Sequence, residues 1–571
     1  MRKHAWRVCM LATAVLALCG PGRNTAQAAR YVVDRNHPQA GDDNPGTEAA
    51  PWKTVQHAAD IARAGDTVCV MEGVYDETLA PKNSGRPGAA IVFRGLPRHK
   101  AQLKGADTGK AAHVRIEGFR FAGEGVSVGG DHVWIVDNTF HDVRRTTVGG
   151  SGSNITVAYN RSTTPSCGVF ASGKGWVVEA NEIEHMVYQT GECDYARFFG
   201  KGHVFRRNFF HGTAQADVRK SHVDGFQTYN LKARAQLQAH DMTFLDNVVY
   251  NFHQGIIARS ADSGFLSNFT IRGNIFAHGL LPNEKGAAVG LIFENVRGIT
   301  VEHNLIADVQ WFAFSPSKTT SGVLRNNIIY KAGNFDRGTR PENLKVSDNL
   351  IFQTKTKNLP QGAVAEADPM FIDPAVDHWR LRAGSPAIGA GTGESDIGPL
   401  PWPNVYHVDA RHPGASDKGA GYSGRPFKTL AHAVSAAAAG ETIVVHRGVY
   451  RETIAPRAEG LTIRAAEAEK VILSGADLVT GWARDPGDPD TWHTALSAKP
   501  ARLLRDGQPF ARFTWDGGAK RITVEGFDPR LHTIETVVRD YAVVLSAKKK
   551  VVIERIETAN TLRQGVAESD G

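Results

Sequence analysis

The stretch VWIVDNTFHD, residues 133–142, contains a four-residue phrase that recurs along the chain. The phrase is an apolar residue, two variable residues and an asparagine, and an apolar or aromatic side chain usually follows after one further residue. Successive asparagines are separated by 22, 21, 27, 39, 27, 30, 23 and 22 residues. The phrase ends at Asn138, Asn160, Asn181, Asn208, Asn247, Asn274, Asn304, Asn327 and Asn349.

An interval that is often 22 residues and tolerates insertions is typical of stacked coils of short strands. Each strand pairs with the coil above and below it, about 4.8 Å away. An asparagine at one corner of every coil predicts a ladder of hydrogen-bonded side-chain amides. Insertions must lie in loops, because a lengthened strand loses its register, so the longest interval predicts a projecting loop. Leucine-rich and helical repeats fit less well, because the phrases lack leucine spacing and are rich in β-branched residues.

The chain also repeats its own beginning, since residues 31–81 align without a gap with residues 406–456. Within the first copy, WKTVQHAADIARAG at residues 52–65 predicts a short helix that is followed by Gly65. Such a helix would cover the open end of a strand stack, so we expect a second stack to begin at Tyr406. The helix face predicted to be buried consists of Val55, Ala58, Ala59, Ile61 and Ala62.

The segment NPGTEAAPWKTVQHAADIARAGDTVCVMEGVY, residues 44–75, resembles the opening of secreted β-helix proteins of the polysaccharide lyase type, notably the family-nine pectate lyases. Residues 367–391 resemble the finishing segment of that family. The resemblance implies an all-β fold, a right-handed parallel β-helix with an N-terminal capping helix. The repeated opening then predicts the start of a second β-helix, cut short after few turns.

Three segments are expected along the chain. Residues 1–28 read as a signal peptide, because basic residues precede an apolar run and the small-residue site Ala26-Gln27-Ala28. Residues 29–400 would form the complete β-helix, and residues 401–571 the incomplete one. The apolar run is too short to span a bilayer. We therefore expect a secreted or periplasmic protein with no membrane span.

The composition favours an acidic partner without indicating nucleic acid. The chain has 571 residues, a formal net charge of +7 and 42% hydrophobic residues, enough for a continuous core. Lysine and arginine are spread along the chain and form no basic runs, so nucleic-acid binding is not expected. For an exported protein, acidic polysaccharide is the more natural polyanion. We expect a monomer.

Three cysteines remain after the predicted signal peptide: Cys69, Cys167 and Cys193. An odd number argues against a scaffold built on disulfides. Cys167 and Cys193 precede equivalent strands in successive coils, which places their Cα atoms within disulfide range. An exported protein permits the bond. Two free buried thiols are the alternative.

A second column of strands follows the asparagine corners, at residues 167–173, 195–200, 224–230, 254–260 and 289–295. Because side chains alternate along a strand, every second residue should point inward. The inward set is Val169, Ala171, Phe226, Thr228, Ile256, Ala258, Leu291 and Phe293. The outward set on one exposed face is Arg197, Gln227, Tyr229, Arg259 and Glu294.

The loop that leads to this face, residues 211–230, concentrates polar residues. A lyase that abstracts the proton beside a uronate carboxylate needs a base, a positive group or metal ion, and a proton donor to the leaving oxygen. The catalytic candidates are Lys220, His222 and Arg259 as base or neutralising group, and Tyr229 as proton donor. The substrate-binding candidates are Arg197, Arg219, Gln227 and Glu294.

Asp224 is the candidate ligand of a calcium ion. The resemblance supports a calcium site only at the start of the family's calcium-binding region, where Asp224-Gly225-Phe226 matches the DGF segment. The next coil reads NFHQGIIARS, residues 251–260, where the family has adjacent aspartates. The calcium site and the lyase activity are therefore both in question.

Plain structural explanations also remain open. Asp224-Gly225 is a common turn, His222 is compatible with a loop cap, and Arg259 with Glu294 with a surface ion pair. The favoured hypothesis is cleavage of acidic polysaccharide by β-elimination. The alternatives are a non-catalytic glycan-binding or envelope-associated scaffold, and a periplasmic polysaccharide epimerase or hydrolase.

Overall fold

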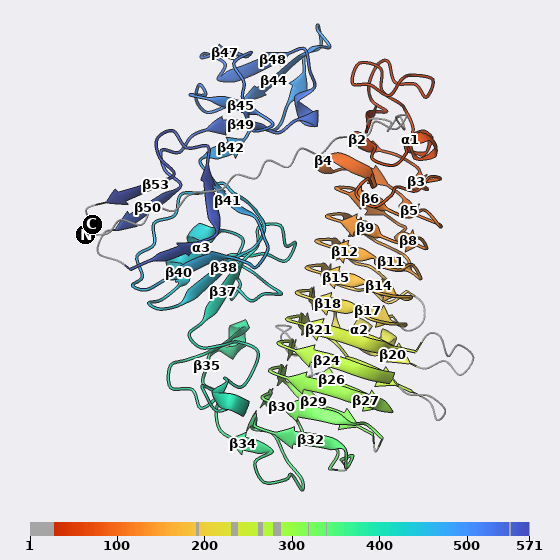
Figure 1. Ribbon diagram of the computed structural model, residues 1–571. Helices are drawn as coiled ribbons and strands as arrows, with labels where there is room; N and C mark the ends of the chain where they lie inside the picture. The colour runs from red at the N-terminus through yellow and green to blue at the C-terminus, as the bar shows by residue number, and fades with distance from the viewer. Residues whose placement is uncertain are drawn as a thin grey trace, which may run out of the picture.

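The computed structural model describes residues 28–189, 193–229, 238–260, 266–277, 287–317, 319–338, 340–546 and 550–569. Most of these residues belong to a tall stack of short parallel strands, with a second group of strands beside it (Figure 1). The predicted all-β parallel β-helix is thus confirmed. The predicted signal peptide lies almost wholly outside the described residues. No helix among the described residues is long and apolar enough to cross a membrane.

One wall of the stack is a ten-stranded parallel sheet, called sheet B here. Most coils contribute one strand to it, and its strands from β3 to β20 are labelled at the right of the stack in Figure 1. Its members are β3 (Thr78–Leu79), β5 (Gly105–Asp107), β8 (Val126–Val128), β11 (Thr146–Gly150), β14 (Cys167–Ala171), β17 (Ala196–Phe198), β20 (Phe226–Tyr229), β23 (Gln254–Arg259), β26 (Ala287–Glu294) and β29 (Val309–Pro316).

The remaining walls form a 24-stranded sheet, called sheet A, to which most coils contribute two strands separated by the asparagine corner. Its members are β1 (Arg30–Val33), β2 (Thr67–Val74), β4 (Ile91–Leu103), β6 (Val114–Glu117), β7 (Arg120–Ala122), β9 (Val133–Val136), β10 (Thr139–His141), β12 (Thr156–Ala158), β13 (Arg161–Thr163), β15 (Val177–Glu179), β16 (Glu182–Glu184), β18 (Val204–Arg206), β19 (Phe209–His211), β21 (His240–Leu245), β22 (Val248–Tyr250), β24 (Leu266–Arg272), β25 (Ile275–Ala277), β27 (Val296–Glu302), β28 (Leu305–Ala307), β30 (Gly322–Arg325), β31 (Ile328–Tyr330), β32 (Leu344–Ser347), β33 (Asn349–Phe352) and β34 (Val364–Glu366).

The asparagine ladder is confirmed from Asn138 to Asn349. Asn274, for example, donates from its backbone N–H at 2.9 Å and from Nδ2 at 3.0 Å to Oδ1 of Asn304. Its own Oδ1 accepts the same pair of bonds from Asn247, at 3.0 and 2.9 Å. The residue before each asparagine has a positive φ, from 52° at Ala180 to 70° at Gly273, which turns the chain sharply. The amides satisfy buried backbone groups at that corner.

The capping helix is α1 (Val55–Ile61), and the side chain of Thr54 accepts a hydrogen bond from the N–H of His57 at its start. Four of the five residues predicted to be buried are buried, but Ile61 is 39% exposed. The reason is helix geometry: at 3.6 residues per turn Val55, Ala58, Ala59 and Ala62 share one stripe, and Ile61 lies beside that stripe. The other described helices are α2 (Gln215–Ser221), η2 (Pro374–Val376), η3 (Thr392–Glu394), α3 (Leu430–Ala436) and η4 (Pro529–Leu531).

The core fills the inside of the stack. The alternation predicted for sheet B is confirmed, because all eight residues predicted to point inward are at most 3% exposed and belong to one hydrophobic cluster, apart from Thr228, which is polar and equally buried. Phe205, Phe226 and Phe244 pack together in this core with ring centroids 4.9 to 5.5 Å apart; Phe205 and Phe244 are stacked, and Phe226 meets both edge to face. These aromatic contacts stabilise the coils that position the site described below.

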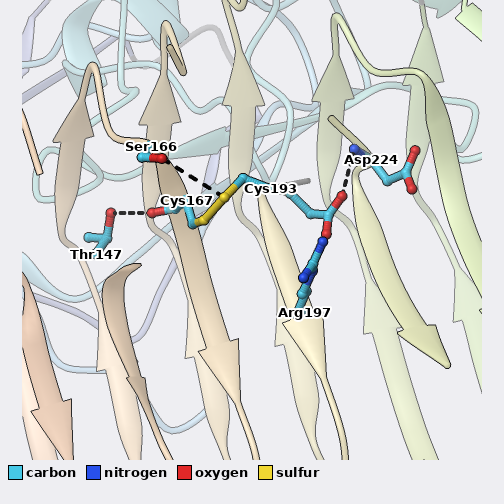
Figure 2. Close-up of a disulfide and its surroundings, with 7 residues drawn as sticks. Thr147, Ser166, Cys167, Cys193, Arg197 and Asp224 are labelled. Atoms are coloured by element: carbon cyan, nitrogen blue, oxygen red, sulfur yellow. Dashed lines mark hydrogen bonds and ion pairs between the residues drawn. A yellow bond between two sulfur atoms is a disulfide. The ribbon is translucent and has the colours of Figure 1, made fainter. Parts of the chain in front are cut away.

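A disulfide joins Cys167 and Cys193, whose Cα atoms are 5.0 Å apart (Figure 2). The bond connects the first residue of β14 to the segment that enters β17, so it ties two successive coils together. Of the two alternatives left open by the sequence, the structure has the bridge. Cys69 is free and buried.

The C-terminal region repeats the start of the fold. Its helix α3 begins at Thr429, whose side chain accepts from the N–H of His432, as Thr54 does at α1. The parallel strands are β37 (Val405–Val408), β38 (Thr442–Val445), β39 (Gly448–Tyr450), β40 (Thr462–Ala465), β41 (Val471–Ser474), β50 (Val543–Ser546), β51 (Val552–Glu554), β52 (Ile556–Ala559) and β53 (Val566–Ser569).

Between β41 and β50 the chain forms antiparallel sheets that the repeat pattern did not predict. Their strands are β42 (Ala476–Leu478), β43 (Ala483–Arg484), β44 (Thr491–Ala495), β45 (Leu503–Arg505), β46 (Gln508–Pro509), β47 (Thr514–Asp516), β48 (Arg521–Glu525) and β49 (Ile534–Val537). A two-stranded antiparallel sheet, β35 (Phe371–Asp373) and β36 (His378–Leu381), lies between the two stacks.

The two stacks share an apolar core. Phe209, Val248 and Ile275 face outward from sheet A, and they are buried by Trp379 from β36 and by Tyr422 from the second stack, in one cluster with neighbouring residues. The second stack therefore covers this outer face of sheet A. It lies on the opposite side of the first stack from sheet B (Figure 1).

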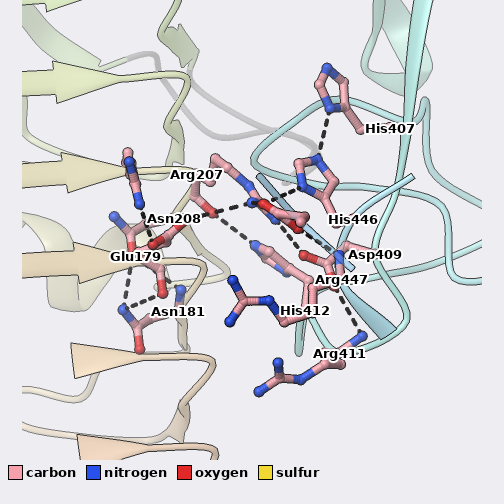
Figure 3. A network of polar contacts seen from close by, with 12 residues as sticks. Glu179, Asn181, Arg207, Asn208, His407, Asp409, Arg411, His412, His446 and Arg447 are labelled. Carbon is pink, nitrogen blue, oxygen red and sulfur yellow. Dashed lines mark hydrogen bonds and ion pairs between the residues drawn. The ribbon is translucent and has the colours of Figure 1, made fainter. Parts of the chain in front are cut away.

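Beside this shared core lies a buried ion-pair network (Figure 3). Arg207 forms an ion pair with Asp409, and both side chains are at most 8% exposed. The Arg207 guanidinium also lies 3.8 Å from Glu469 of the second stack. His412 Nε2 lies 2.8 Å from the carbonyl oxygen of Arg207. At the other end, Arg530 lies 3.2 Å from Asp34. The C-terminal region is thus attached to the first stack at two places.

Candidate functional site

The outward side chains of sheet B form a row that changes in character along the stack. Strand pairing aligns its members one coil apart. In order they are Asp107, Ser127, Gly149, Phe170, Arg197, Gln227, Ile257 and Ile292, and we call them the outer row. Small and polar residues are followed by one aromatic residue, two polar residues and then an apolar end.

Two aspartates lie beside the polar part of the outer row. Asp194 precedes β17 and Asp224 precedes β20 at the equivalent place, and the N–H of Asp224 donates to Oδ1 of Asp194 at 3.0 Å. Arg197 Nε donates to the other carboxylate oxygen of Asp194 (Figure 2). Both aspartate side chains are almost fully buried, whereas that of Arg197 is 20% exposed. Asp194 therefore holds Arg197 at the surface, and neither aspartate faces solvent itself.

Burial and the neighbouring Asp194 carboxylate raise the pKa of Asp224 well above its usual value. Two carboxylates this close do not ionise independently, since the second charge is opposed by the first and by the low local dielectric. Gln227 Nε2 donates to Asp224 Oδ2 at 3.2 Å, and the N–H of Gln254 donates to Oδ1 at 3.0 Å. The pair thus retains a proton more readily than an exposed carboxylate does.

Two histidines complete the cluster. The rings of His222 and His253 stack with centroids 4.8 Å apart, and His253 Nδ1 lies 3.8 Å from Asp224 Oδ1. Burial and the neighbouring His222 lower the pKa of His253, so its imidazole is neutral at pH 7. Three buried atoms here have no hydrogen-bond partner among the described residues: Gln227 Oε1, Gln254 Oε1 and His253 Nδ1.

Some of the predicted site residues lie at the edge of this cluster and not within it. Arg259 forms an ion pair with Glu294 at 3.3 Å, with about half of each side chain exposed. Tyr229 is aligned with Arg259 in the neighbouring strand. On α2, Lys220 Nζ lies 4.2 Å from the ring centroid of Tyr188. Arg219 is exposed on the same helix. They remain candidates at the edge of the cluster.

One predicted feature of the face is wrong: Gln227 is only 8% exposed, so it does not offer its side chain at an open surface. The Gln227 amide is turned toward Asp224. Strand alternation predicts the direction in which a side chain points, but it does not predict whether other residues cover that side chain. Sequence reasoning also missed Asp194 and His253. Asp194 had a signal, since Cys193-Asp194-Tyr195 and Val223-Asp224-Gly225 occupy equivalent positions one coil apart.

The acid pair does not fit a calcium ion as it is arranged. Calcium takes six to eight oxygen ligands at about 2.3–2.6 Å. All four carboxylate oxygens of Asp194 and Asp224 already accept N–H groups, and Arg197 supplies the positive charge. The unpartnered amide oxygens of Gln227 and Gln254 are neutral acceptors, which suit donor groups such as hydroxyls. We therefore derive no step through calcium.

A second acidic cluster lies on sheet A. Ligand atoms of Glu182, Glu184 and His211 lie within 4.8 Å of one another. Arg161 lies 3.1 Å from Glu182 and 2.6 Å from Glu184, between the two carboxylates. The guanidinium thus already occupies the place of a cation, and the cluster is an ion-pair network.

A groove runs along sheet B up to the cluster. Its volume is about 900 Å³, within the range of ligand sites. The outer-row residues Asp107, Ser127, Gly149 and Phe170 line it, and Lys104, Glu124, Arg144 and Arg145 add charged groups. A side chain at Gly149 would place its Cβ 3.2 Å from Cβ of Phe170, so glycine keeps this floor low. The groove stops at Phe170, one coil before Arg197.

A family model described as a protein of unknown function, DUF1565, matches residues 39–280. Uncharacterized protein YwoF of Bacillus subtilis (strain 168) is 38% identical over 76 residues, 13% of this chain and 16% of that protein. The chain thus spans about a sixth of that relative's length.

Several solved structures are similar at low identity. Pectate lyase Pel9A has a TM-score of 0.39 and 15% identity, over 66% of this chain and 97% of its own. A family 6 polysaccharide lyase from Pseudopedobacter saltans has 0.36 and 14%, over 57% and 88%. A GH136 lacto-N-biosidase from Eubacterium ramulus has 0.33 and 10%, over 59% and 67%. Two of these are named lyases and one a biosidase.

Proposed function

We propose that the protein is exported and binds acidic, uronate-containing polysaccharide along the outer row of sheet B, and cleaves it by β-elimination at the cluster around Arg197. The observation that carries this proposal is the groove of about 900 Å³ that leads toward a partly exposed arginine held by the buried Asp194. An arginine fixed in this way is suited to a carboxylate, since its planar fork loses little freedom on binding.

The cluster offers the groups that elimination needs. Arg197 would neutralise the uronate carboxylate and so favour loss of the neighbouring carbon-bound proton. The neutral imidazole of His253, with His222 stacked on it, would accept that proton. Tyr229, whose ring lies 5.2 Å from that of Phe199 beside the cluster, would donate a proton to the leaving oxygen. Asp194 and Asp224 are positioning residues, because burial keeps them from touching substrate.

Elimination is detected as unsaturated uronate, which absorbs in the near ultraviolet. Polygalacturonate, alginate and glycosaminoglycans would be incubated separately with the protein and with its His253→Gln and Arg197→Gln variants. We expect product from one polymer with the wild type, and loss of at least a hundredfold in rate in both variants. Binding without product from any polymer would contradict β-elimination.

A non-catalytic glycan-binding scaffold is the second candidate, and one observation favours it. The two exposed cations first considered as catalytic are engaged elsewhere, Lys220 with the Tyr188 ring and Arg259 with Glu294. For such a scaffold the groove and Arg197 would suffice. It predicts that Arg197→Gln weakens binding of the polymer while His253→Gln leaves binding unchanged, with no product in either case.

A further inference from the structure

The outer row is open at one end of sheet B and covered at the other. Asp107 and Ser127 are exposed at the N-terminal end, where they line the groove. Ile257 is 5% exposed and Ile292 is 2% exposed, although both point away from the core of the stack. Gln227, which precedes them in the row, is 8% exposed, so the accessible floor ends at Arg197.

The covered end is a separate apolar cluster outside the main core. Ile257, Val289 and Ile292 pack together, with Phe312 of β29 partly buried against them. The guanidinium of Arg337 lies 5.5 Å from the centroid of the Phe312 ring. Because these side chains are already desolvated, a polar sugar chain has no surface to lie on beyond Gln227.

The accessible part spans several coils on one side of the site only. Strands β3 and β14 are four coil steps apart, and at about 4.8 Å for each step the groove extends for about 19 Å. Arg197 lies one step further on, and Ile257 is two steps beyond Arg197. A bound sugar chain thus has room in the groove, on the N-terminal side of Arg197, but little room on the C-terminal side.

We propose that the site accepts a chain end, so that the protein acts on the terminus of an acidic polysaccharide and holds the following units in the groove. This inference rests on the proposed function. The apolar cluster is the wall against which the terminal unit stops. Lys104, Arg144 and Arg145 are the groove cations that face the carboxylates of the units behind it.

Stoichiometry tests this mode of binding. Polygalacturonate and alginate would each be separated into fractions of defined length and titrated calorimetrically into the His253→Gln variant, so that the polymer stays intact, with a wild-type titration alongside. Recognition of chain ends predicts about one protein bound for each polymer chain at every length. A number of bound proteins that rises in proportion to length would overturn the inference while leaving the proposed function intact. Absence of binding to these two polymers and to a glycosaminoglycan titrated in the same way would overturn both.

A groove variant provides an independent check. Ser127 is exposed on the outer row three coil steps before Arg197, so Ser127→Tyr should obstruct the groove without entering the core. We expect at least a tenfold loss of affinity for long oligomers and unchanged binding of the shortest ones. Ser497→Tyr, at an exposed residue of the antiparallel insertion, is the matched control and should bind like the wild type. Equal affinity of Ser127→Tyr and wild type for long oligomers would contradict occupation of the groove.

Discussion

Asp224 lies one coil beyond Asp194, and its backbone N–H donates to the Asp194 carboxylate at 3.0 Å, so two acids are stacked at equivalent positions in the β-helix. Arg197 belongs to the same coil as Asp194 and completes the arrangement by donating a hydrogen bond to the Asp194 carboxylate. The regular spacing of the coils places the two aspartates at equivalent positions in adjacent coils. Because both aspartates are buried, Arg197 is the cation that balances their charge. This relationship makes the site sensitive to either carboxylate.

Replacement of Asp194 should disturb the position of Arg197 more than the fold. Asp194→Asn keeps an oxygen acceptor for the Asp224 N–H but removes the negative charge that holds the guanidinium. We expect weaker binding of uronate polymer by at least tenfold, with a thermal midpoint within a few degrees of the wild type. Calorimetric titration and a thermal melt measure the two quantities. A variant that binds like the wild type would show that Asp194 does not position Arg197.

Calcium should have no effect on the wild-type protein, because Arg197 already neutralises the acid pair. Removing the guanidinium in Arg197→Gln leaves two carboxylates and the amide oxygens of Gln227 and Gln254 without a cation, which favours a divalent ion. Titration with calcium chloride should give no heat of binding for the wild type and a measurable affinity for the variant. Tight calcium binding by the wild type would contradict this account of the acid pair.

The asparagine ladder should be necessary for stability in the middle of the stack. Asn274→Ala removes the acceptor of two hydrogen bonds from Asn247 and leaves buried backbone groups unsatisfied. At about 1–3 kcal/mol for each unsatisfied group, we expect a loss of about 3 kcal/mol or more in the free energy of unfolding. Denaturant unfolding measures it, with the exposed Asn343→Ala as control. Equal losses in the two variants would argue against the ladder.

Contact between the two stacks should depend on the buried pair Arg207 and Asp409. Removing one partner of a buried ion pair costs about 3–5 kcal/mol, because the other charge remains buried. We therefore expect Asp409→Asn to lower stability by about that amount, and to speed proteolysis between the stacks. Arg206→Gln, at a side chain that is 46% exposed, is the control. Wild-type stability of Asp409→Asn would mean that the stacks do not dock through this pair.

Stability should fall when the pH is lowered from 6.5 toward 4. Burial lowers the pKa of His412 to about 4, whereas the unfolded side chain has its ordinary value of 6.5. Between these values the unfolded chain binds the proton and the folded protein does not, so the folded state loses up to about 3 kcal/mol as pH falls. Denaturant midpoints at pH 7 and pH 5 should differ less for His412→Gln than for the wild type. An unchanged pH dependence would contradict the assignment to His412.

The ladder and the inward residues of sheet B were predictable because a repeated spacing specifies both. The burial of Gln227 was not predictable, because strand alternation gives the direction of a side chain but not whether other residues cover it. His253 was not predicted because the family pattern has aspartates in that coil, and a histidine gives no sign in the sequence that burial will keep it neutral. The antiparallel strands between β41 and β50 lack the asparagine phrase, so the repeat gave no signal for them. Ile61 was misplaced because its position on the helix lies beside the buried stripe of Val55, Ala58, Ala59 and Ala62 and not within it.

The most direct test of the account is a crystal structure of the protein with a bound uronate oligosaccharide. We expect the sugar chain to lie over Ser127, Gly149 and Phe170, with a carboxylate on Arg197 and one chain end against Ile257. An oligosaccharide bound elsewhere would contradict it, for example in the cavity of about 650 Å³ between the two stacks that His446 and Tyr422 line.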